Sequence, residues 1–384
     1  MVRKICLVLT SRGNYAKMRS VIDHIRADHE LQLQLIVGGG ALLHKYGDIA
    51  ATITSAGIPI DRMVHFLVEG ETPVTMAKSA GLAVSEFSTA LDNLRPDVVV
   101  VIADRFECLP LAMTAAYMNI PVAHVEGGEV SGSIDESIRH AITKLAHVHF
   151  PATEEAARRI ERMGEDPVTI FAVGATSLDV IASLDLDDLS AVQKLQKTQG
   201  VGPVVDLRQP YLVVIQHPVT TEYSDNLTHI HETIAAVETT GMNAVWIWPN
   251  MDAGSDGISK GIRLFRERSH SAAIHYFKGL AIEYYAPLLK NASCLVGNSS
   301  SGIRESAFLG VPTVNIGTRQ QSRLRGENVR DVPYDRGAIL EAINFQVRHG
   351  QYPLVPLYGD GKAGMRIVSI LRNMKFSVQK KITY

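Results

Sequence analysis

The sequence contains little cysteine, and its cysteines form no motif. The 384-residue chain has three, Cys6, Cys108 and Cys294, and each lies in a separate apolar run. No cysteine and histidine spacing in the chain is typical of a zinc site. We therefore interpret the three cysteines as core thiols in a reducing compartment, and we predict a cytoplasmic protein without a metal site.

Blocks of like charge and long apolar runs are also absent. The formal net charge is −2 with no basic block, which excludes nucleic acid as the main partner, because binding a phosphate backbone requires clustered Lys and Arg. No apolar run approaches the roughly 20 residues of a membrane span, so no membrane partner is expected. Residues 1–15 place basic residues before an apolar run, as signal peptides do, but the run is too short and no small-residue cleavage site follows. We predict a buried first strand there instead.

Two common nucleotide-binding motifs are missing. No GxxxxGKS pattern occurs, which argues against a P-loop nucleoside triphosphatase. The glycine run at 37–41 follows an apolar stretch but lacks the spaced GxGxxG pattern, so it is weak evidence for a dinucleotide site. Neither motif therefore identifies a nucleotide-binding site.

The composition is globular, with 46% hydrophobic and 20% charged residues, and short apolar runs alternate with helix-like segments. Several runs are apolar without alternation, as expected for strands covered on both faces. Repeated strand–helix alternation predicts parallel sheets with helices on both sides. The predicted strands are 4–10, 31–38, 62–66, 97–104, 121–127, 168–174, 211–218, 243–249, 272–277, 292–298 and 311–317.

A polar segment interrupts this alternation and predicts a division into two domains. Residues 183–209 are rich in Asp, Gln and Lys, and we interpret them as a linker. We predict an N-terminal Rossmann-like domain over 1–182, a C-terminal Rossmann-like domain over 210–361, and a closing helix and tail over 362–384. The predicted fold class is α/β, with two doubly wound parallel-sheet halves facing each other across a cleft.

Carboxylates gather where strands of the first predicted domain end. Ligands of doubly wound sheets bind beyond the carboxyl ends of the strands. Carboxylates close together repel each other, which raises the pKa of some of them and suits general acid–base catalysis. A metal site and a solvated loop remain the alternatives, although EF-hand spacing is lacking. The acidic residues are Asp104, Glu126, Glu129, Asp135 and Glu136.

Three consecutive serines in the second predicted domain follow an apolar run and precede a predicted helix, in the stretch GNSSSGIRE at 297–305. Free N–H groups at a helix N-terminus bind anions, and the hydroxyls of Ser299 and Ser300 add donors, which favours a phosphate cradle. A simple N-cap is the alternative, and one serine would satisfy it. Glu305, about one turn into the same helix, either accepts from a ribose diol or complements the helix dipole.

Isolated polar residues also follow predicted strands. Arg12 and Arg319 can each form a forked pair with phosphate, although a lone arginine is more often a surface or ion-pair residue. His217 precedes a proline at a strand end, and a capped or solvated histidine is an equal alternative. The remaining candidates near strand ends are Arg105, Arg139 and Asn250.

Seven stretches that span most of the chain form one further pattern: HVEGGEVSGSIDESIRHAITKLAH (124–147), QHPVTTE (216–222), WPNMDAGS (248–255), GNSSSGIRE (297–305), NIGTRQ (315–320), RGENV (325–329) and YGDG (358–361). The pattern resembles the hydrolysing UDP-N-acetylglucosamine 2-epimerases. It is similar in particular to the epimerase half of the animal bifunctional epimerase/kinase that starts sialic acid synthesis. Bacterial sialic- and legionaminic-type pathway enzymes share the resemblance.

The resemblance implies a GT-B-like fold of two Rossmann-type domains, and a reaction that needs no cofactor. UDP-N-acetylglucosamine and water would give N-acetylmannosamine and UDP. The C2 proton is lost as UDP departs, which leaves a 2-acetamidoglucal; water then adds at C1 and C2 is reprotonated on the opposite face. Positioned acids and bases can perform these steps without metal or nicotinamide. The family also implies a homodimer or homotetramer.

The resemblance further implies roles for the candidate residues. Three match the family's catalytic acids, without distinguishing base from acid: Asp104, Glu126 and Asp135. His217 matches a histidine near the diphosphate that assists the leaving group. The substrate-binding candidates are Arg12, Ser299 and Ser300 for the diphosphate, Glu305 for the ribose, and Arg105, Arg139, Asn250 and Arg319 as further contacts.

Four alternatives to this function stay open. The same chemistry on another UDP- or GDP-linked acetamido or diacetamido sugar is poorly separated by sequence. A GT-B glycosyltransferase would transfer the sugar to an acceptor, and a non-hydrolysing epimerase would keep the nucleotide attached. A sugar-nucleotide-binding regulator need not keep Asp104, Glu126 and Asp135 together, so their joint presence argues against it.

Overall fold

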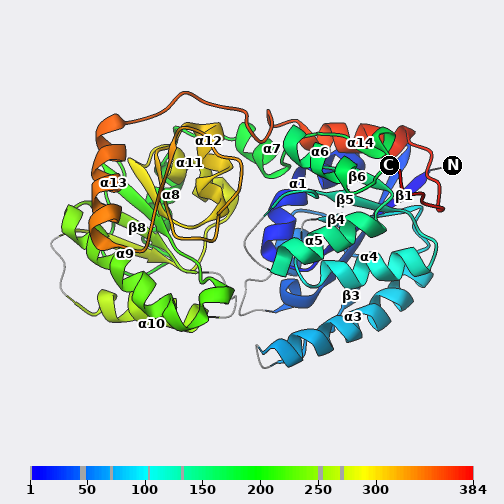
Figure 1. The fold of residues 1–384 in the computed structure, drawn as a ribbon, viewed down its shortest axis with the longest axis horizontal. Helices are drawn as coiled ribbons and strands as arrows, with labels where there is room; N and C mark the ends of the chain where they lie inside the picture. The colour runs from blue at the N-terminus through cyan, green and yellow to red at the C-terminus, as the bar shows by residue number, and fades with distance from the viewer. Residues whose placement is uncertain are drawn as a thin grey trace. The chain divides into compact units, whose positions relative to one another are not determined.

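The chain folds into two compact units, each a parallel sheet covered by helices (Figure 1). The first unit contains the described residues up to Val130, then Ile134–Val180 and the chain from Tyr358 onward, and the second contains Ile181–Leu357. The computed structural model describes residues 2–43, 49–69, 72–102, 104–130, 134–249, 254–268 and 272–383.

The first unit is built on six parallel strands in the order β3-β2-β1-β4-β5-β6. All five residues of β4 are apolar and buried, as expected where helices cover both faces of a sheet. Side chains alternate between the faces, so Ile5 and Leu7 of β1 join one core while Cys6 and Val8 join the other. The strands are β1 (Arg3–Leu9), β2 (Leu31–Gly38), β3 (Arg62–Val64), β4 (Val98–Ile102), β5 (Val122–Val125) and β6 (Val148–Phe150).

Helices cover both faces of this sheet. Ser11 caps α1 (Arg12–Ala27) at the end of β1, where its hydroxyl accepts the N–H of Asn14. α1 packs against α14 (Ala363–Asn373) over one core, and α3 (Pro73–Leu94) packs against α4 (Cys108–Tyr117) over the other. The other helices are η1 (Gly39–Leu42), α2 (Ile49–Ser55), α5 (Ile134–Leu145), α6 (Glu154–Arg162), η3 (Pro167–Thr169) and α7 (Ser177–Ala182), the last of which runs into the second unit.

The second unit repeats the plan, with six parallel strands in the order β12-β11-β10-β7-β8-β9. Trp246 of β8 lies in the core of this unit, fully buried between helices and sheet. The strands are β7 (Tyr211–Ile215), β8 (Asn243–Ile247), β9 (Ile274–Phe277), β10 (Cys294–Gly297), β11 (Thr313–Ile316) and β12 (Val329–Val332). The helices are α8 (Ser190–Leu195), η4 (Thr220–Asp225), α9 (Asn226–Thr240), α10 (Ser255–Arg266), α11 (Ile282–Lys290), η5 (Ser300–Gly302), α12 (Glu305–Leu309) and α13 (Arg336–His349).

The two sheets confirm the predicted class of doubly wound parallel α/β structure, but one predicted strand is wrong. Residues 168–174 form the turn η3 and a single bridge between Ile170 and His149. Pro167 starts that turn and Val168 is 73% exposed, whereas Val173 is buried in the core of the unit, so the run passes from the surface into the core without forming a strand. The sixth strand of the first sheet is instead the three-residue β6, which was not predicted. The half-exposed edge strand β12 of the second sheet was not predicted either.

The boundary between the units differs from the predicted linker. Residues 183–209 belong to the second unit, where α8 packs against α11 and Val205 and Leu207 are buried. The chain from Tyr358 onward returns to the first unit, so the predicted closing helix is α14, packed against α1.

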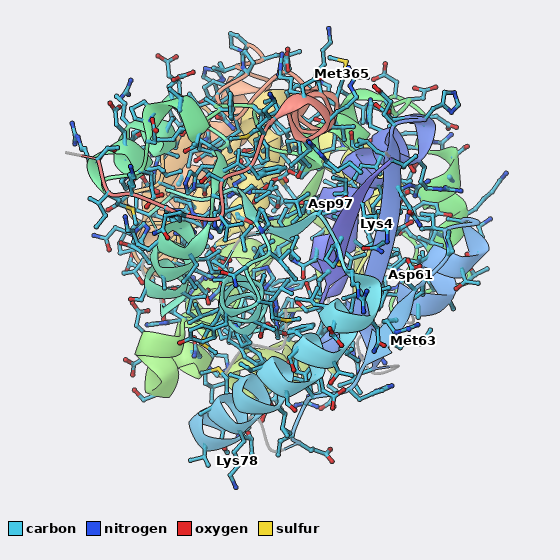
Figure 2. The ribbon with its side chains drawn as sticks, turned by 90° about the vertical axis from the view of Figure 1, so that its right-hand side faces the viewer. Lys4, Asp61, Met63, Lys78, Asp97 and Met365 are labelled. Carbon is cyan, nitrogen blue, oxygen red and sulfur yellow. The ribbon has the colours of Figure 1, made fainter. Side chains whose placement is uncertain are left out.

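Aspartates tie the starts of two strands to their neighbours. Asp97, the residue before β4, accepts the N–H of Lys4 at 2.7 Å with its carboxylate, and donates its own N–H to the Lys4 carbonyl at 3.0 Å (Figure 2). Asp61, before β3, makes the same two bonds to Leu35 of β2, at 2.7 and 2.9 Å. Each carboxylate thus extends the ladder by one bond beyond the strand and helps to set its register.

The strand order puts one switch point in each sheet, between β1 and β4 in the first unit and between β7 and β10 in the second. The helices that follow β1 and β4 pack into different cores, on opposite faces of the sheet. Ligands of doubly wound folds bind at the carboxyl ends of the strands beside such a point. The strand ends next to these points carry four candidate residues: Arg12, Asp104, His217 and Ser299.

The C-terminal tail is held against the first unit by a buried carboxylate. Glu165 is 2% exposed and pairs with Lys144 at 2.5 Å, Lys380 at 2.6 Å and His149 at 3.2 Å. Burial opposes ionisation, but these partners outweigh it and lower the pKa of Glu165 to about 2. Burial also lowers the pKa of His149, which favours its neutral form.

We expect Glu165→Gln to destabilise the protein by about 1–3 kcal/mol at pH 7, since it removes a buried charge whose lysine partners can still reach solvent. The folded-state pKa lies below the unfolded value of 4.5, so the carboxylate stabilises the fold above pH 4.5 and loses this effect as the pH falls toward 2. Thermal unfolding across this range should show the gap between variant and wild type narrowing with acidity. The exposed Glu161→Gln is the control, and a gap independent of pH would contradict the assignment.

Candidate active site

Asp104 and Arg139 form a largely buried ion pair at the carboxyl edge of the first sheet. Asp104 follows β4, and its carboxylate accepts from the Arg139 side chain of α5, at 3.0 Å for the Nε–H and from Nη2 as well. The Arg139 side chain is 1% exposed and the Asp104 side chain 21%. Arg139 also donates to the carbonyl of Glu129 at 2.6 Å. The guanidinium therefore ties Asp104 to the loop after β5.

Glu126 occupies a strained and buried position. It directly follows β5 with φ +60°, in the left-handed region that non-glycine residues seldom adopt. Its side chain is 1% exposed, and its Oε2 lies 2.6 Å from the Nζ of Lys17 on α1. The ammonium thus holds one oxygen of the carboxylate in place. Strain of this kind persists where the surrounding structure over-determines it, commonly at functional sites.

The remaining acids of the cluster lie on or before α5. Asp135 and Glu136 stand in the first turn of the helix, where negative charge complements the helix dipole. His140 lies 3.8 Å from Glu136, one turn further on. Burial and the neighbouring Arg139 charge lower the pKa of His140, so the neutral form is favoured near neutral pH. The fold thus places Asp104, Glu126 and the start of α5 at one edge of the first sheet.

Two predicted arginines sit at the same edge. Arg105 makes a forked pair with the buried Glu107, at 3.2 and 3.1 Å, which fixes its side chain along the loop after β4. Arg12 is the first residue of α1. A diphosphate contact by Arg12 and a substrate contact by Arg105 remain predictions.

A helix follows the serines as predicted, but Glu305 is its first residue instead of lying one turn into it. Residues of the serine stretch form the three-residue turn η5, followed by the five-residue helix α12. Ser299 caps η5 by accepting the N–H of Ser301, so one serine performs the capping role. The Ser301 hydroxyl lies 2.6 Å from that of Tyr285 and 3.0 Å from that of Ser299. The hydroxyls are therefore linked to α11, and any phosphate contact would come from this turn.

The loops after β7 and β11 meet beside the serine stretch. His217 donates its N–H to Oδ1 of Asn298 at 2.7 Å, and Arg319 donates to the Asn298 carbonyl at 3.3 Å. Glu305 is the first residue of α12. The fold therefore brings His217, the serines and Arg319 to one edge of the second sheet, while Asn250 lies outside the described residues.

Among the residues that the structure describes, no group of three or more His, Cys, Asp or Glu residues has an arrangement that could hold a metal ion. None of the helices described has the length and apolarity that a membrane span needs. The three cysteines are buried and free, and burial raises the pKa of each thiol, as expected for core residues.

The family profile for UDP-N-acetylglucosamine 2-epimerase matches residues 23–372. The chain belongs to this family. The match confirms the predicted relationship, and it covers both units and most of the candidate residues.

Relatives in the family act on more than one sugar. A UDP-N,N'-diacetylbacillosamine 2-epimerase (hydrolyzing) of Legionella pneumophila is 32% identical over 379 residues, 99% of this chain and 98% of the relative. A UDP-N-acetylglucosamine 2-epimerase of Neisseria meningitidis is 31% identical over 94% of this chain and 92% of the relative. The chain thus resembles family members of two named substrate types to nearly the same extent.

Solved structures of the family share the fold. The Neisseria meningitidis UDP-GlcNAc 2-epimerase bound to UDP-GlcNAc has a TM-score of 0.80 at 17% identity, with 96% of this chain and 99% of that chain covered. The Methanocaldococcus jannaschii enzyme in complex with UDP-GlcNAc and UDP has a TM-score of 0.79 at 18% identity, with the same coverage. These neighbours confirm the predicted GT-B-like fold.

Sequence reasoning missed several residues that hold the site together. Lys17 lies in the second turn of α1 and not at a strand end, where the candidate residues were expected. Its role becomes visible only from its ion pair with Glu126. Glu107 follows Arg105 by two residues, which is a spacing that a search for ion pairs could have found. Asn298 stood within the serine stretch but was not singled out.

We expect Lys17→Met to lower turnover at pH 7 by about tenfold or more, because it removes the ammonium that lies 2.6 Å from Oε2 of the buried Glu126 and holds this carboxylate in place. The measurement is kcat, with circular dichroism as the check of folding. Arg19→Met, which removes an exposed pair with Asp23 on the same helix, is the control. A kcat of folded Lys17→Met equal to that of the wild type would show that the pair does not position Glu126.

Proposed function

We propose that this chain is a hydrolysing 2-epimerase that converts UDP-N-acetylglucosamine and water to N-acetylmannosamine and UDP. The observation that carries the proposal is the arrangement of Asp104 and Glu126, two carboxylates at one sheet edge, each paired with its own cation, in a chain of the UDP-N-acetylglucosamine 2-epimerase family. Each ion pair holds its carboxylate in place at the sheet edge, as a positioned proton donor or acceptor requires.

The first unit would perform the proton transfers. The C2 proton of the sugar is poorly acidic, so a base must act as the C1–O bond to UDP breaks, which yields a 2-acetamidoglucal. Water then adds to C1, its hydroxyl bonding there, while a proton is delivered to C2 on the opposite face. Asp104, Glu126 and Asp135 are the proposed acids and bases. Lys17 and Arg139 hold two of them in place through pairs within the unit.

The second unit would hold the nucleotide. UDP leaves with additional negative charge, which the Arg319 guanidinium, the serine hydroxyls of η5 and His217 can stabilise. Glu305 is the proposed partner of the ribose hydroxyls. Arg12, Arg105 and Asn250 remain further proposed contacts of the substrate. No cofactor is required, because the steps are proton transfers, the departure of a good leaving group and the addition of water to C1.

The product suggests a role in surface sugar biosynthesis. Free N-acetylmannosamine has lost its nucleotide and is a starting unit for sialic-acid-type sugars. In support, an Escherichia coli relative named polysialic acid biosynthesis protein P7 is 32% identical over 89% of this chain. We also propose that the protein is cytoplasmic and forms a homodimer or homotetramer.

A second candidate is the same reaction on a UDP-linked diacetamido sugar. The relative that favours it is the Legionella enzyme named for UDP-N,N'-diacetylbacillosamine, at 32% identity over 99% of this chain. The proton transfers and the loss of UDP would be unchanged. Only the contacts with the sugar would differ.

We expect the purified protein in deuterated water to convert UDP-N-acetylglucosamine to UDP and free N-acetylmannosamine with deuterium at C2. Solvent supplies the proton that returns to C2, which is why the label enters there. Proton NMR follows both products. Turnover of UDP-N,N'-diacetylbacillosamine alone would select the second candidate. Absence of turnover with both sugars would refute the proposed function.

We expect Asp104→Asn and Glu126→Gln each to lower turnover by at least about 100-fold while the Kd of UDP changes less than about threefold. Both substitutions preserve shape but remove a proton acceptor. Turnover is measured as the rate of UDP release, and the Kd of UDP is measured by calorimetry. Circular dichroism checks folding, because Arg139 and Lys17 lose their counter-charges. Loss of UDP binding with intact turnover of bound substrate would reverse the assignment of acids and nucleotide contacts.

A further inference from the structure

Asn298 is a fully buried residue at the carboxyl end of β10, between Gly297 and Ser299. Its side-chain amide forms two hydrogen bonds with the backbone of His217. Oδ1 accepts the His217 N–H at 2.7 Å, and Nδ2 donates to the His217 carbonyl at 2.9 Å. The amide group therefore bonds to His217 as a peptide group of a neighbouring strand would.

This pairing continues the sheet beyond its last backbone bonds. The parallel ladder between β7 and β10 ends where Gly297 pairs with Ile215, and the N–H of Asn298 donates to the Ile215 carbonyl at 3.1 Å. The Asn298 side chain then reaches the backbone two residues further along. Without it, the loop that carries His217 would leave the sheet directly after β7.

The backbone of Asn298 is also a meeting point for the loop after β11. Its carbonyl accepts from Gln320 at 2.9 Å and from Arg319 at 3.3 Å. One residue thus joins the segments that follow β7 and β11.

Gly297 makes this close approach possible. Its φ is +134°, and a Cβ at this position would lie 1.9 Å from the carbonyl oxygen of Ile215. Only glycine fits there, because any side chain would displace the backbone of β7 or β10. Each residue of the Gly297–Ser299 sequence therefore has a geometric role. The glycine allows the close approach to Ile215, the asparagine amide pairs with the backbone of His217, and the serine caps η5.

We propose that Asn298 is a positioning residue for the leaving group. It fixes the backbone of His217 with its amide and orients Arg319 with its carbonyl, so that both stand beside the serines at the proposed diphosphate position. The proposal rests on the proposed function, because it takes the ligand of this edge to be a nucleoside diphosphate. It assigns no contact with substrate to Asn298 itself.

Asn298→Asp tests the pairing directly. The introduced carboxylate keeps the acceptor for the His217 N–H but faces the His217 carbonyl with an oxygen instead of a donor. Ionised, it should weaken UDP binding by about tenfold or more relative to wild type at pH 8. Burial raises the pKa of such a carboxyl. The protonated form restores an O–H donor, so the deficit should shrink as the pH falls toward 5.5.

Calorimetry gives the Kd of UDP for variant and wild type at each pH, and their ratio cancels titration of UDP and of histidines shared by both. Gln346→Glu is the matched control: it is buried in the same unit and donates to the carbonyls of Thr313 and Asn328, away from the proposed ligand. It should lower stability without a pH-dependent loss of UDP affinity. A ratio near one at pH 8, or a deficit in the folded Asn298→Asp that does not change with pH, would overturn the proposal.

Hydrogen exchange separates this proposal from the proposed function. In Asn298→Ala, the backbone N–H of His217 should exchange about tenfold faster than in the wild type, while the amides of β8 stay protected. Unchanged exchange at His217 would refute the positioning role. A wild-type protein that binds no UDP would instead refute the proposed function, and the exchange result would still decide whether Asn298 holds His217.

Discussion

Two neighbouring parallel strands at a switch point lose their common ladder just where a ligand must be held. The segments after β1 and β4 lead to helices on opposite faces of the first sheet, so backbone pairing cannot continue there. Buried polar side chains take over this task. In the first unit the pair of Lys17 and Glu126 links the helix after β1 to the loop after β5, and in the second unit Asn298 of the β10 end bonds to His217 after β7. The candidate site depends on these cross-links.

The same device appears at the amino ends of two strands of the first sheet. Asp97 and Asp61 extend the ladders of β4 and β3 with their carboxylates. At the carboxyl edge the linking side chains, such as Arg139, are more deeply buried, and holding them there costs free energy of folding. An ion pair such as Arg139 with Asp104 adds little net stability, since desolvation offsets most of the attraction. The backbone of Glu126 adds strain of about 1 kcal/mol or more. These costs are consistent with residues kept for chemistry and for position.

Much of the fold could be predicted from hydrophobic pattern. Uninterrupted apolar runs such as β4 are typical of strands buried on both faces, and the alternation with helices implied parallel sheets. The errors fall where local pattern and tertiary context disagree. The three residues of β6 are too short to stand out beside α5, and β12 is a half-exposed edge strand. Residues 168–174 are apolar enough for a strand, but they begin in the turn after Pro167 and pair with His149 of β6 at a single bridge.

By itself, the sequence determined the class of fold, the family, and which strand ends carry acids, serines and arginines. These follow from composition, hydrophobic period and short motifs, each of which can be recognised from residues that are close together in the sequence. Only the tertiary structure decided that Lys17 faces Glu126, that Arg139 belongs to Asp104, and that Asn298 pairs with His217. Each pair joins residues distant in sequence, by 109, 35 and 81 positions. Such contacts depend on strand order and on the turn of each helix, and no local pattern specifies either.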